Sequence, residues 1–294
     1  MPENAYMPRS AKVQWMRDET PDVRTLGLVL EDPASATRFQ WRAGQFALFS
    51  VFGAGECVFT LANSPTRRTT TGSDGNGQAQ VTDEAPTIEC TFRAVGKITN
   101  ALRQLDAGQV AGIRGPYGNA FDVEAWKGHH VAIVGGGIGM AAVRSPLQYV
   151  LDHRADYGEV HVLNGARSVG DVVYASEMSE WAQRGAEVVC TVDPGGETPD
   201  WGGRVGMIPA VFEELALAPE KRIVVACGPP VMLRYLFASL KKLGFPPCDV
   251  VTTLENRMKC GVGHCGRCNV GRTYLCTSGP VFTWAQLQSM PEDL

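Results

Sequence analysis

Four cysteines near the end of the chain have the residue type and spacing of a metal-cluster site. Cys260, Cys265, Cys268 and Cys276 are separated by four, two and seven residues. Their thiolates must converge on a small volume, and glycines between them let the backbone curl without Cβ strain. Four-then-two spacing followed by a distal cysteine is typical of a plant-type [2Fe-2S] centre. A structural zinc ion is the rival interpretation, although zinc sites more often have two C-x-x-C pairs and this segment has one.

A glycine-rich turn between an apolar run and a helical stretch is a second candidate site. It comprises Gly135, Gly136, Gly137, Ile138 and Gly139. Backbone N–H groups at such a turn face an anion at the start of the next helix, and pyrophosphate is the usual occupant. The dinucleotide pattern is imperfect, because its sixth position is Met140 and the next strand ends at Asn164 and Gly165 without an acid. NAD and NADP therefore both stay open, and tight strand-to-helix packing is the alternative.

A third candidate site follows another apolar run. Cys227 and Gly228 precede Pro229 and Pro230, which can open a helix at its first turn. Ligands of parallel α/β sheets lie at the carboxyl ends of the strands, so Cys227 is placed where a nicotinamide ring could rest. A buried thiol without a functional role is the alternative.

Two kinds of element must position these residues. From about residue 128 onward, apolar runs alternate with amphipathic stretches, which predicts a doubly wound parallel α/β sheet. Before residue 128, short strands separated by turn residues predict an antiparallel β-barrel. In the sheet we expect strands at 131–136, 159–164, 187–192, 222–227 and 249–254, and helices at 140–151, 171–184, 208–217 and 230–243. In the barrel we expect strands at 11–18, 23–30, 45–51, 58–63, 88–95 and 109–115.

Composition excludes several classes of protein. The 294 residues are 44% apolar and carry a formal charge of −4, which excludes a nucleic-acid binder held by phosphate electrostatics. No apolar run reaches the ~18 residues of a membrane span, and the first residues lack the basic and apolar regions of a secretion signal. We therefore expect a cytoplasmic protein without a membrane span. The polar stretch 66–87 predicts a long hairpin insertion in the barrel.

Six motifs follow one another along nearly the whole chain. They are GQFALFSVFGAGECVFTLANSP, FRAVGKITNAL, IRGPYGN, VGGGIGMA, VACGPPVML and ENRMKCGVGHCGRC with YLCTSGPVFTW. Together they resemble the motifs of the gamma (diaphorase) subunit of cytoplasmic NAD(P)-linked nickel–iron hydrogenases, also called sulfhydrogenases. Similar families are the electron-transfer subunits of anaerobic sulfite reductase and of dihydroorotate dehydrogenase, all within the ferredoxin–NADP reductase superfamily. The resemblance implies an FAD-binding barrel at 1–127, an NAD(P)-binding domain at 128–247 and a [2Fe-2S] segment at 248–294.

The resemblance also assigns flavin contacts. The family motif Arg-x-Tyr-Ser or Arg-Pro-x-Ser corresponds here to Cys57, Val58, Phe59 and Thr60. It implies that Phe59 lies against the isoalloxazine and that Thr60 hydrogen-bonds its reactive N5 edge. Leu61 and Ala62 supply main-chain contacts.

Further contacts follow from other motifs of the resemblance. Cys57 replaces the family's arginine, so the cation for the flavin pyrophosphate must be Arg93, Lys97 or a residue of a partner subunit. The second flavin motif corresponds to Gly96, Lys97, Ile98 and Thr99, at the start of a short helix whose N–H groups and Thr99 hydroxyl can hold phosphate. Arg167 corresponds to a position near the adenosine half of the nucleotide.

The resemblance implies an electron relay with FAD between the nucleotide and the cluster. A nicotinamide gives up two electrons as a hydride, a [2Fe-2S] centre accepts one, and a flavin converts between them. The expected function is that of the diaphorase subunit of a soluble nickel–iron hydrogenase, with partner subunits that carry further iron–sulfur centres. An electron-transfer subunit of sulfite reductase or dihydroorotate dehydrogenase is an alternative, and a zinc-stabilised nucleotide-binding regulatory module is an alternative of a different class.

Overall fold

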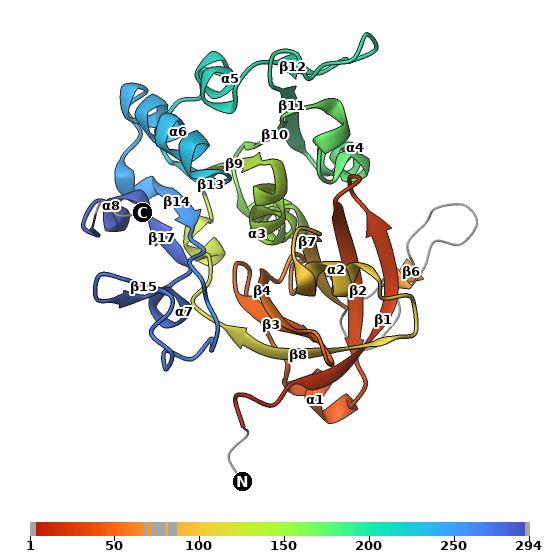
Figure 1. Cartoon of the computed structure of the whole chain (residues 1–294). Coiled ribbons are helices and arrows are strands. Elements are labelled where there is room, and N and C mark those ends of the chain that lie inside the picture. The colour runs from red at the N-terminus through yellow and green to blue at the C-terminus, as the bar shows by residue number, and fades with distance from the viewer. Residues whose placement is uncertain (1–3, 68–69, 72–79, 82–86, 292–294) are drawn as a thin grey trace. The chain divides into compact units, whose positions relative to one another are not determined.

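A computed structural model describes residues 4–67, 70–71, 80–81 and 87–291 of the chain (Figure 1). The chain forms two compact units. The first takes in residues up to Asp18, Asp22–Phe121 and Glu255–Pro280, and the second takes in Glu19–Pro21, Asp122–Leu254 and the chain from Val281. The cysteine-rich segment therefore belongs to the same unit as the N-terminal strands, although about 130 residues of sequence separate them.

The first unit is built on a six-stranded antiparallel sheet in the order β4-β3-β8-β1-β2-β7. Its outer strands meet through a bridge between Leu61 and Cys90, so the sheet curls into a barrel. The predicted antiparallel barrel is confirmed. The strands are β1 (Arg9–Asp18), β2 (Val23–Leu30), β3 (Phe46–Val51), β4 (Gly55–Thr60), β7 (Ile88–Arg93) and β8 (Val110–Tyr117), and the helices of this region are α1 (Pro33–Arg38) and α2 (Lys97–Arg103).

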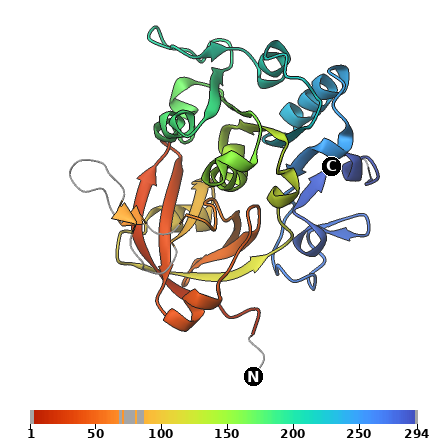
Figure 2. The ribbon, with the colours of Figure 1, turned by 180° about the vertical axis from the view of Figure 1, so that it is seen from behind.

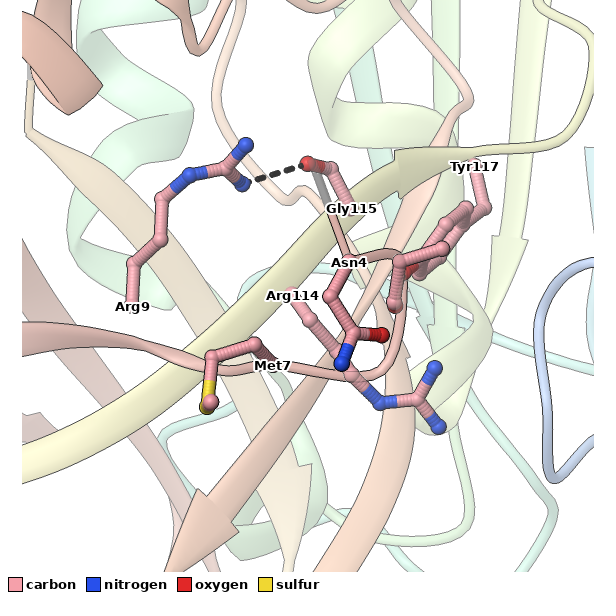
Figure 3. A pocket seen from close by; sticks show the side chains of 7 residues that line it. Asn4, Met7, Arg9, Arg114, Gly115 and Tyr117 are labelled. Carbon is pink, nitrogen blue, oxygen red and sulfur yellow. Dashed lines mark hydrogen bonds between the residues drawn. The ribbon is translucent and has the colours of Figure 1, made fainter. Parts of the chain in front are cut away.

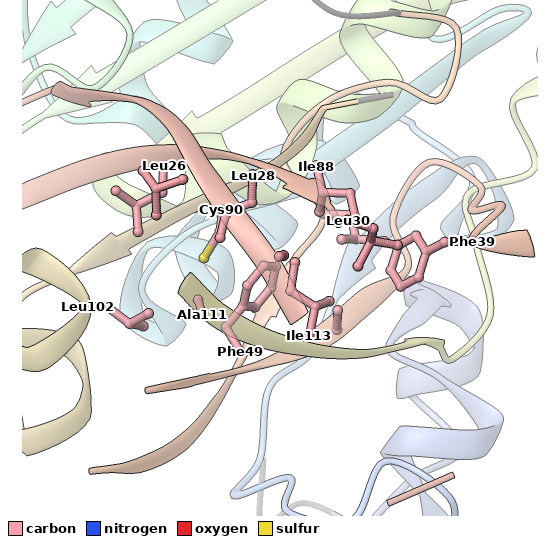
Figure 4. Packing of buried hydrophobic residues seen from close by; sticks show 14 of the residues in the cluster. Leu26, Leu28, Leu30, Phe39, Phe49, Ile88, Cys90, Leu102, Ala111 and Ile113 are labelled. Carbon is pink, nitrogen blue, oxygen red and sulfur yellow. The ribbon is translucent and has the colours of Figure 1, made fainter. Parts of the chain in front are cut away.

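The barrel core is made by alternate residues of these strands. Leu26 and Leu28 of β2 face Ile88 and Cys90 of β7, and Phe49 of β3 joins them (Figure 4). All five side chains are fully buried. Burial of such side chains stabilises a fold by roughly 1.5–3 kcal/mol each, which explains why the period-2 pattern of the sequence identified the strands.

The expected hairpin insertion at 66–87 lies largely outside the described residues. Within it, β5 (Thr70–Thr71) pairs antiparallel with β6 (Gln80–Val81).

The second unit is a seven-stranded sheet in the order β12-β11-β10-β9-β13-β14-β17, with its strands labelled in Figure 1 and the ribbon seen from behind in Figure 2. All neighbouring pairs are parallel except β14 with β17, so the predicted doubly wound sheet is confirmed. The strands are β9 (His130–Gly136), β10 (Val160–Ala166), β11 (Ala186–Val192), β12 (Arg204–Val205), β13 (Arg222–Cys227), β14 (Val250–Thr253) and β17 (Val281–Thr283). The helices are α3 (Met140–Asp152), α4 (Met178–Gln183), α5 (Ile208–Glu214), α6 (Pro230–Lys242) and α8 (Trp284–Leu287).

One predicted helix is shorter than expected. The helix expected at 171–184 is α-helical over Met178–Gln183 and is preceded by the 3-10 turns Val169–Asp171 and Ala175–Glu177. Tyr174 takes a left-handed φ of 58°, which an α-helix cannot contain. Further 3-10 turns are Val123–Trp126, Gly137–Gly139, Arg154–Asp156 and Pro247–Asp249.

The cysteine-rich segment has little regular structure. It contains the hairpin β15 (Asn269–Val270) and β16 (Thr273–Tyr274), followed by α7 (Leu275–Ser278). Among the described residues, no helix has the length and apolar character needed to cross a bilayer.

Candidate functional site

The carboxyl edge of the parallel sheet has a topological switch point between β9 and β13. From β9 the chain proceeds outward through β10, β11 and β12, whereas β13 and β14 lie on the other side of β9. Loops after β9 and β13 therefore diverge, and ligands of open α/β sheets bind in the crevice that this divergence creates. Gly135 of β9 is in register with Cys227 of β13, so the glycine-rich turn and the Cys-Gly-Pro-Pro turn leave the sheet side by side.

The glycines of the turn serve two different purposes. A Cβ on Gly139 would lie 2.5 Å from the carbonyl oxygen of Cys227, and a Cβ on Gly135 would meet the Met140 sulfur, so both positions need glycine for packing. Gly137 has a φ of +54° and open space where a Cβ would be. Gly137 is therefore needed for its left-handed backbone and not for packing, and the open space beside this half-buried residue fits the close approach of an anion.

The second turn is built as the sequence predicts. Pro229 is the N-cap of α6 and Pro230 its first residue, while Cys227 and Gly228 are half-buried. A Cβ on Gly228 would meet the Met232 side chain and lie 3.3 Å from the Cα of Gly136. Gly228 thus allows the two turns to approach each other closely.

Residues at and just after the end of β10 are candidates for contact with the adenosine half of a nucleotide. The Asn164 amide is fully buried and donates a 2.9 Å hydrogen bond to the Val173 carbonyl, so it orders the following loop. Arg167, just past the strand, is exposed. The Asp193 N–H donates to the Ala166 carbonyl at 3.0 Å, which brings the end of β11 next to Arg167.

The predicted flavin motif lies on β4 of the barrel unit. Cys57 and Phe59 pair with Phe49 and Ala47 of β3 and share their face, whereas Val58 and Thr60 point the other way. All four motif residues are half-buried. The Phe59 ring packs 6.0 Å from the Phe49 ring, centroid to centroid, and keeps an accessible edge.

The backbone N–H groups that follow the flavin motif already form hydrogen bonds within the barrel. The Leu61 and Ala62 N–H groups donate to the carbonyls of Gln45 and Glu89 at 3.0 and 2.9 Å. Burial raises the pKa of the Cys57 thiol, so Cys57 stays protonated and adds no negative charge. A thiol has no cationic form, so Cys57 cannot replace the family's arginine.

The second flavin motif forms the start of α2. The Thr99 hydroxyl accepts hydrogen bonds from the Gly96 and Val95 N–H groups at 2.9 and 3.0 Å, so it caps the helix. Arg93 forms an ion pair with Asp22 at 3.0 Å. Lys97 is exposed and forms no ion pair with any residue that the structure describes. Of the two cations considered for the missing arginine, Lys97 is the one without an intramolecular counter-charge.

Backbone N–H groups converge on the sulfurs of the cysteine-rich segment. The Val262 and His264 N–H groups donate to Cys260 Sγ at 3.5 and 3.3 Å, and the Gly263 N–H donates to Cys276 Sγ at 3.2 Å. Gly261, Gly263 and Gly266 have φ values of +80°, +76° and +67°, which confirms that the backbone needs glycine to curl there. Such donors stabilise thiolates and therefore fit a cluster held by sulfur.

The thiols interact with one another: Cys260 with Cys265, and Cys276 with both Cys268 and Cys260. Burial opposes ionisation of Cys260, but the backbone hydrogen bonds outweigh it and lower its pKa to about 6. Burial and the contact with Cys268 raise the pKa of Cys276 to about 12. Among the described residues, no three His, Cys, Asp or Glu side chains are arranged to hold one metal ion. Two thiolates on each of two irons is the arrangement of a [2Fe-2S] centre, whereas zinc gathers all four ligands on one ion.

Arg114 of β8 anchors this segment and was not identified from the sequence. Its guanidinium binds both Glu56 oxygens at 2.8 and 2.6 Å and donates to the Lys259 and Cys260 carbonyls at 2.8 and 2.5 Å. The side chain is 3% exposed. A strand arginine has no sequence signal for partners so far along the chain.

The N-terminal residues complete the surroundings of Arg114. The Tyr6 and Tyr117 rings each lie 5.8 Å from its guanidinium carbon, and the Tyr6 hydroxyl bonds His264 Nδ1 at 2.7 Å. A pocket of about 190 Å³ lies beside them (Figure 3). Its lining is Asn4, Ala5, Met7, Arg9, Arg114, Gly115 and Tyr117.

An antiparallel barrel, a doubly wound sheet with a glycine turn at its switch point, and a four-cysteine segment together define an NAD-dependent electron-transfer oxidoreductase with flavin-type and iron–sulfur-type sites. Residues 133–236 match the oxidoreductase NAD-binding domain family. Residues 255–288 match the iron–sulfur cluster binding domain of dihydroorotate dehydrogenase B. These two matches give the chain a pyridine-nucleotide site and an iron–sulfur cluster site.

Relatives that match nearly the whole chain identify the family within this class of oxidoreductase. The chain is 32% identical to sulfhydrogenase 1 subunit gamma of Pyrococcus furiosus, over 98% of this chain and 95% of that one. It is 28% identical to a probable dihydroorotate dehydrogenase B electron transfer subunit of Thermoplasma acidophilum, over 95% and 91% of the two chains. The chain belongs to the family of sulfhydrogenase gamma subunits.

Solved structures support the fold. The chain is similar to an NADH-dependent reduced ferredoxin-NADP oxidoreductase with a TM-score of 0.71 and 20% identity, over 100% of this chain and 92% of that one. It is also similar to a ferredoxin NADP+ reductase from Neisseria gonorrhoeae solved with bound FAD and NADP, with a TM-score of 0.64 and 16% identity, over 83% and 96% of the chains. The predicted ferredoxin–NADP reductase fold is confirmed.

Proposed function

We propose that the chain is the diaphorase subunit of a cytoplasmic nickel–iron hydrogenase and passes electrons between NAD(P)H and a partner catalytic subunit. The convergence of backbone N–H groups on the Cys260 and Cys276 sulfurs, in a chain that also has a nucleotide-type switch point, carries this proposal. A bound flavin accepts two electrons together and releases them singly, which a nicotinamide and an iron–sulfur cluster cannot do for each other.

In this proposal the sheet unit binds and orients the nucleotide. The Gly137 backbone receives the pyrophosphate, with Gly136, Ile138 and Gly139 shaping the turn. Cys227, Gly228 and Pro229 leave room for the nicotinamide because none carries a large side chain. Arg167 holds a phosphate of the adenosine half, since it is an exposed cation at the end of β10.

The barrel unit positions the flavin in the same proposal. The accessible edge of Phe59 offers an apolar surface to the ring, and Thr60 on the opposite face of β4 offers a hydroxyl. Lys97 supplies the cation that Cys57 cannot. Because the Thr99 hydroxyl is used for capping, the first N–H groups of α2 are the donors left for phosphate.

Cys260, Cys265, Cys268 and Cys276 hold the cluster. By residue range, we assign flavin binding to 1–127, nucleotide binding to 128–247 and cluster binding to 248–294. The chain would deliver electrons to hydrogenase subunits that carry further iron–sulfur centres, since the relatives are subunits by name. A dihydroorotate dehydrogenase partner is the second candidate, favoured by the match of residues 255–288.

Purification of the native complex tests this proposal directly. We expect a hydrogenase large subunit to co-purify, with flavin, and with iron and acid-labile sulfide in equal amounts on this chain. Reduction by NAD(P)H should produce the EPR signal of a reduced [2Fe-2S] centre. Zinc in place of iron, or a chain that is colourless after anaerobic reconstitution, would refute it.

A further inference from the structure

The part of the cysteine-rich segment that belongs to the barrel unit has a charge opposite to that of the chain as a whole. Between Glu255 and Pro280 there are four cations and one acid, Glu255, whereas the whole chain carries −4. The cations are Arg257, Lys259, Arg267 and Arg272. We call these four residues the cationic rim.

Every member of the cationic rim is exposed, and none forms an ion pair within the part of the chain that the structure describes. Some other exposed cations of this protein are paired: Lys127 lies 2.8 Å from Glu124, and Arg204 lies 2.8 Å from Glu214. Four unpaired cations within 16 residues of sequence make this segment electropositive, so it attracts an external anionic group.

Two members of the rim lie close in sequence to the accessible cysteine. Of the four cysteines, Cys260, Cys268 and Cys276 are buried and Cys265 is exposed. Arg267 lies between Cys265 and Cys268 in sequence, and Arg272 is at the turn of the β15–β16 hairpin. Tyr274 of that hairpin is 40% exposed. An exposed ring next to cations is typical of the centre of a protein interface.

We propose that the exposed Cys265 edge, together with the cationic rim and Tyr274, is the docking surface for an electron-carrying protein whose own surface is acidic. This inference rests on the proposed function, because it places the exit of electrons at the cluster. Opposite charges raise the rate at which two proteins meet by roughly 10- to 1,000-fold and align their surfaces. The docking partner is thus selected by charge, and the cluster is reached at its most exposed ligand.

The test measures how the rate of electron transfer depends on salt. The full chain, reconstituted anaerobically with flavin, iron and sulfide, is reduced with dithionite and mixed with cytochrome b5, an acidic carrier, or cytochrome c, a basic one. Because the two carriers differ in driving force, the slope of rate against ionic strength is compared and not the rate itself. We expect the rate with cytochrome b5 to fall about ten-fold between low and physiological ionic strength, and the rate with cytochrome c to rise.

Charge reversal supplies the decisive comparison. The double variant Arg267→Glu with Arg272→Glu leaves two cations and two anions in the rim and should flatten both slopes, whereas Lys241→Glu, an exposed cation of α6, should leave them unchanged. The cluster midpoint potential is measured on each protein by EPR. If the double variant keeps the salt slopes of the unaltered chain but has a different cluster midpoint potential, the cations only offset the charge of the cluster. That result would overturn the docking proposal.

The failure of the underlying function gives a different result. If the proposed function is wrong, no cluster signal forms in the unaltered chain and both proposals fall. If the cluster forms and NAD(P)H reduces it, but the salt slopes are flat, only the docking surface is refuted.

Discussion

Arg114 and Cys260 lie 146 residues apart in sequence, yet a hydrogen bond of 2.5 Å joins the Arg114 guanidinium to the Cys260 carbonyl. The same guanidinium holds Glu56 of β4 through two bonds. One buried cation thus connects the strand that carries the flavin motif to the first cysteine of the cluster segment. All of these groups belong to the barrel unit.

Replacement of Arg114 should therefore loosen the cysteine segment. Arg114→Gln leaves two carbonyls and the Glu56 carboxylate without their donor, which should reduce the free energy of unfolding by about 2–4 kcal/mol. Arg114→Lys keeps the charge but not the fork of donors, so it should restore stability only in part. Urea unfolding and iron content per chain measure both effects. Arg42→Gln, at an exposed site of the same unit, is the control. Full iron content in Arg114→Gln would show that the anchor is dispensable.

The two kinds of glycine in the nucleotide turn should respond differently to alanine. Gly139→Ala places a Cβ 2.5 Å from the Cys227 carbonyl and should lower stability by roughly 2–3 kcal/mol. Gly137→Ala meets no atom and costs about 1–2 kcal/mol for the left-handed backbone. The Gly137 variant should nevertheless show the larger rise in nucleotide KM relative to its change in melting temperature. Unchanged nucleotide KM in Gly137→Ala would leave this turn as a packing feature.

Local sequence patterns predicted the fold well because its elements are set by nearby residues. The strands around Leu26, Phe49 and Val134 followed from alternation or from continuous apolar runs, and each lies within a few residues of its expected position. The helix expected at 171–184 was too long because Tyr174 interrupts it in a left-handed conformation. Side-chain volume and tertiary contacts decide such a break, and neither is visible in a local pattern.

A candidate site could be predicted from the sequence where all of its residues lie in one short segment. The cysteine set and the glycine turn satisfy that condition. Arg114 and Tyr6 do not, because their partners Cys260 and His264 lie far along the chain. Likewise, the engagement of the Thr99 hydroxyl as a helix cap depends on side-chain direction, which spacing alone does not give.

Stability should fall on acidification through a histidine of the sheet unit. Burial and the neighbouring Arg222 charge lower the pKa of His161 in the folded protein, despite its ion pair with Glu187. The unfolded chain binds this proton at higher pH, so protonation favours unfolding as the pH falls below the ordinary histidine range. His161→Gln should flatten the dependence of unfolding free energy on pH between about 7 and about 5. His129→Gln, at a half-buried position of the same unit, is the control, and an unchanged slope in His161→Gln would contradict the assignment.

Loss of one cluster ligand should block electron delivery to the partner without affecting reduction of the flavin by NAD(P)H. Cys265→Ser removes the exposed thiolate and should abolish delivery to the partner, while NAD(P)H still bleaches the flavin absorbance at an unchanged rate. Cys248→Ser, an exposed cysteine outside the set, should leave both steps intact. Partner reduction that survives in Cys265→Ser would refute the cluster assignment.

Arg167 provides a test of nucleotide preference that is independent of stability. Because the side chain is exposed, Arg167→Ala should change the free energy of unfolding by no more than about 0.5 kcal/mol. A charge-assisted bond to phosphate contributes roughly 1.5–3 kcal/mol, so nucleotide KM should rise about ten- to one-hundred-fold. If the bond is to a 2′-phosphate, the rise affects NADPH and spares NADH; if it is to the pyrophosphate, both nucleotides are affected alike. Lys241→Ala is the matched control, and an unaltered KM for both nucleotides in Arg167→Ala would remove this residue from the binding site.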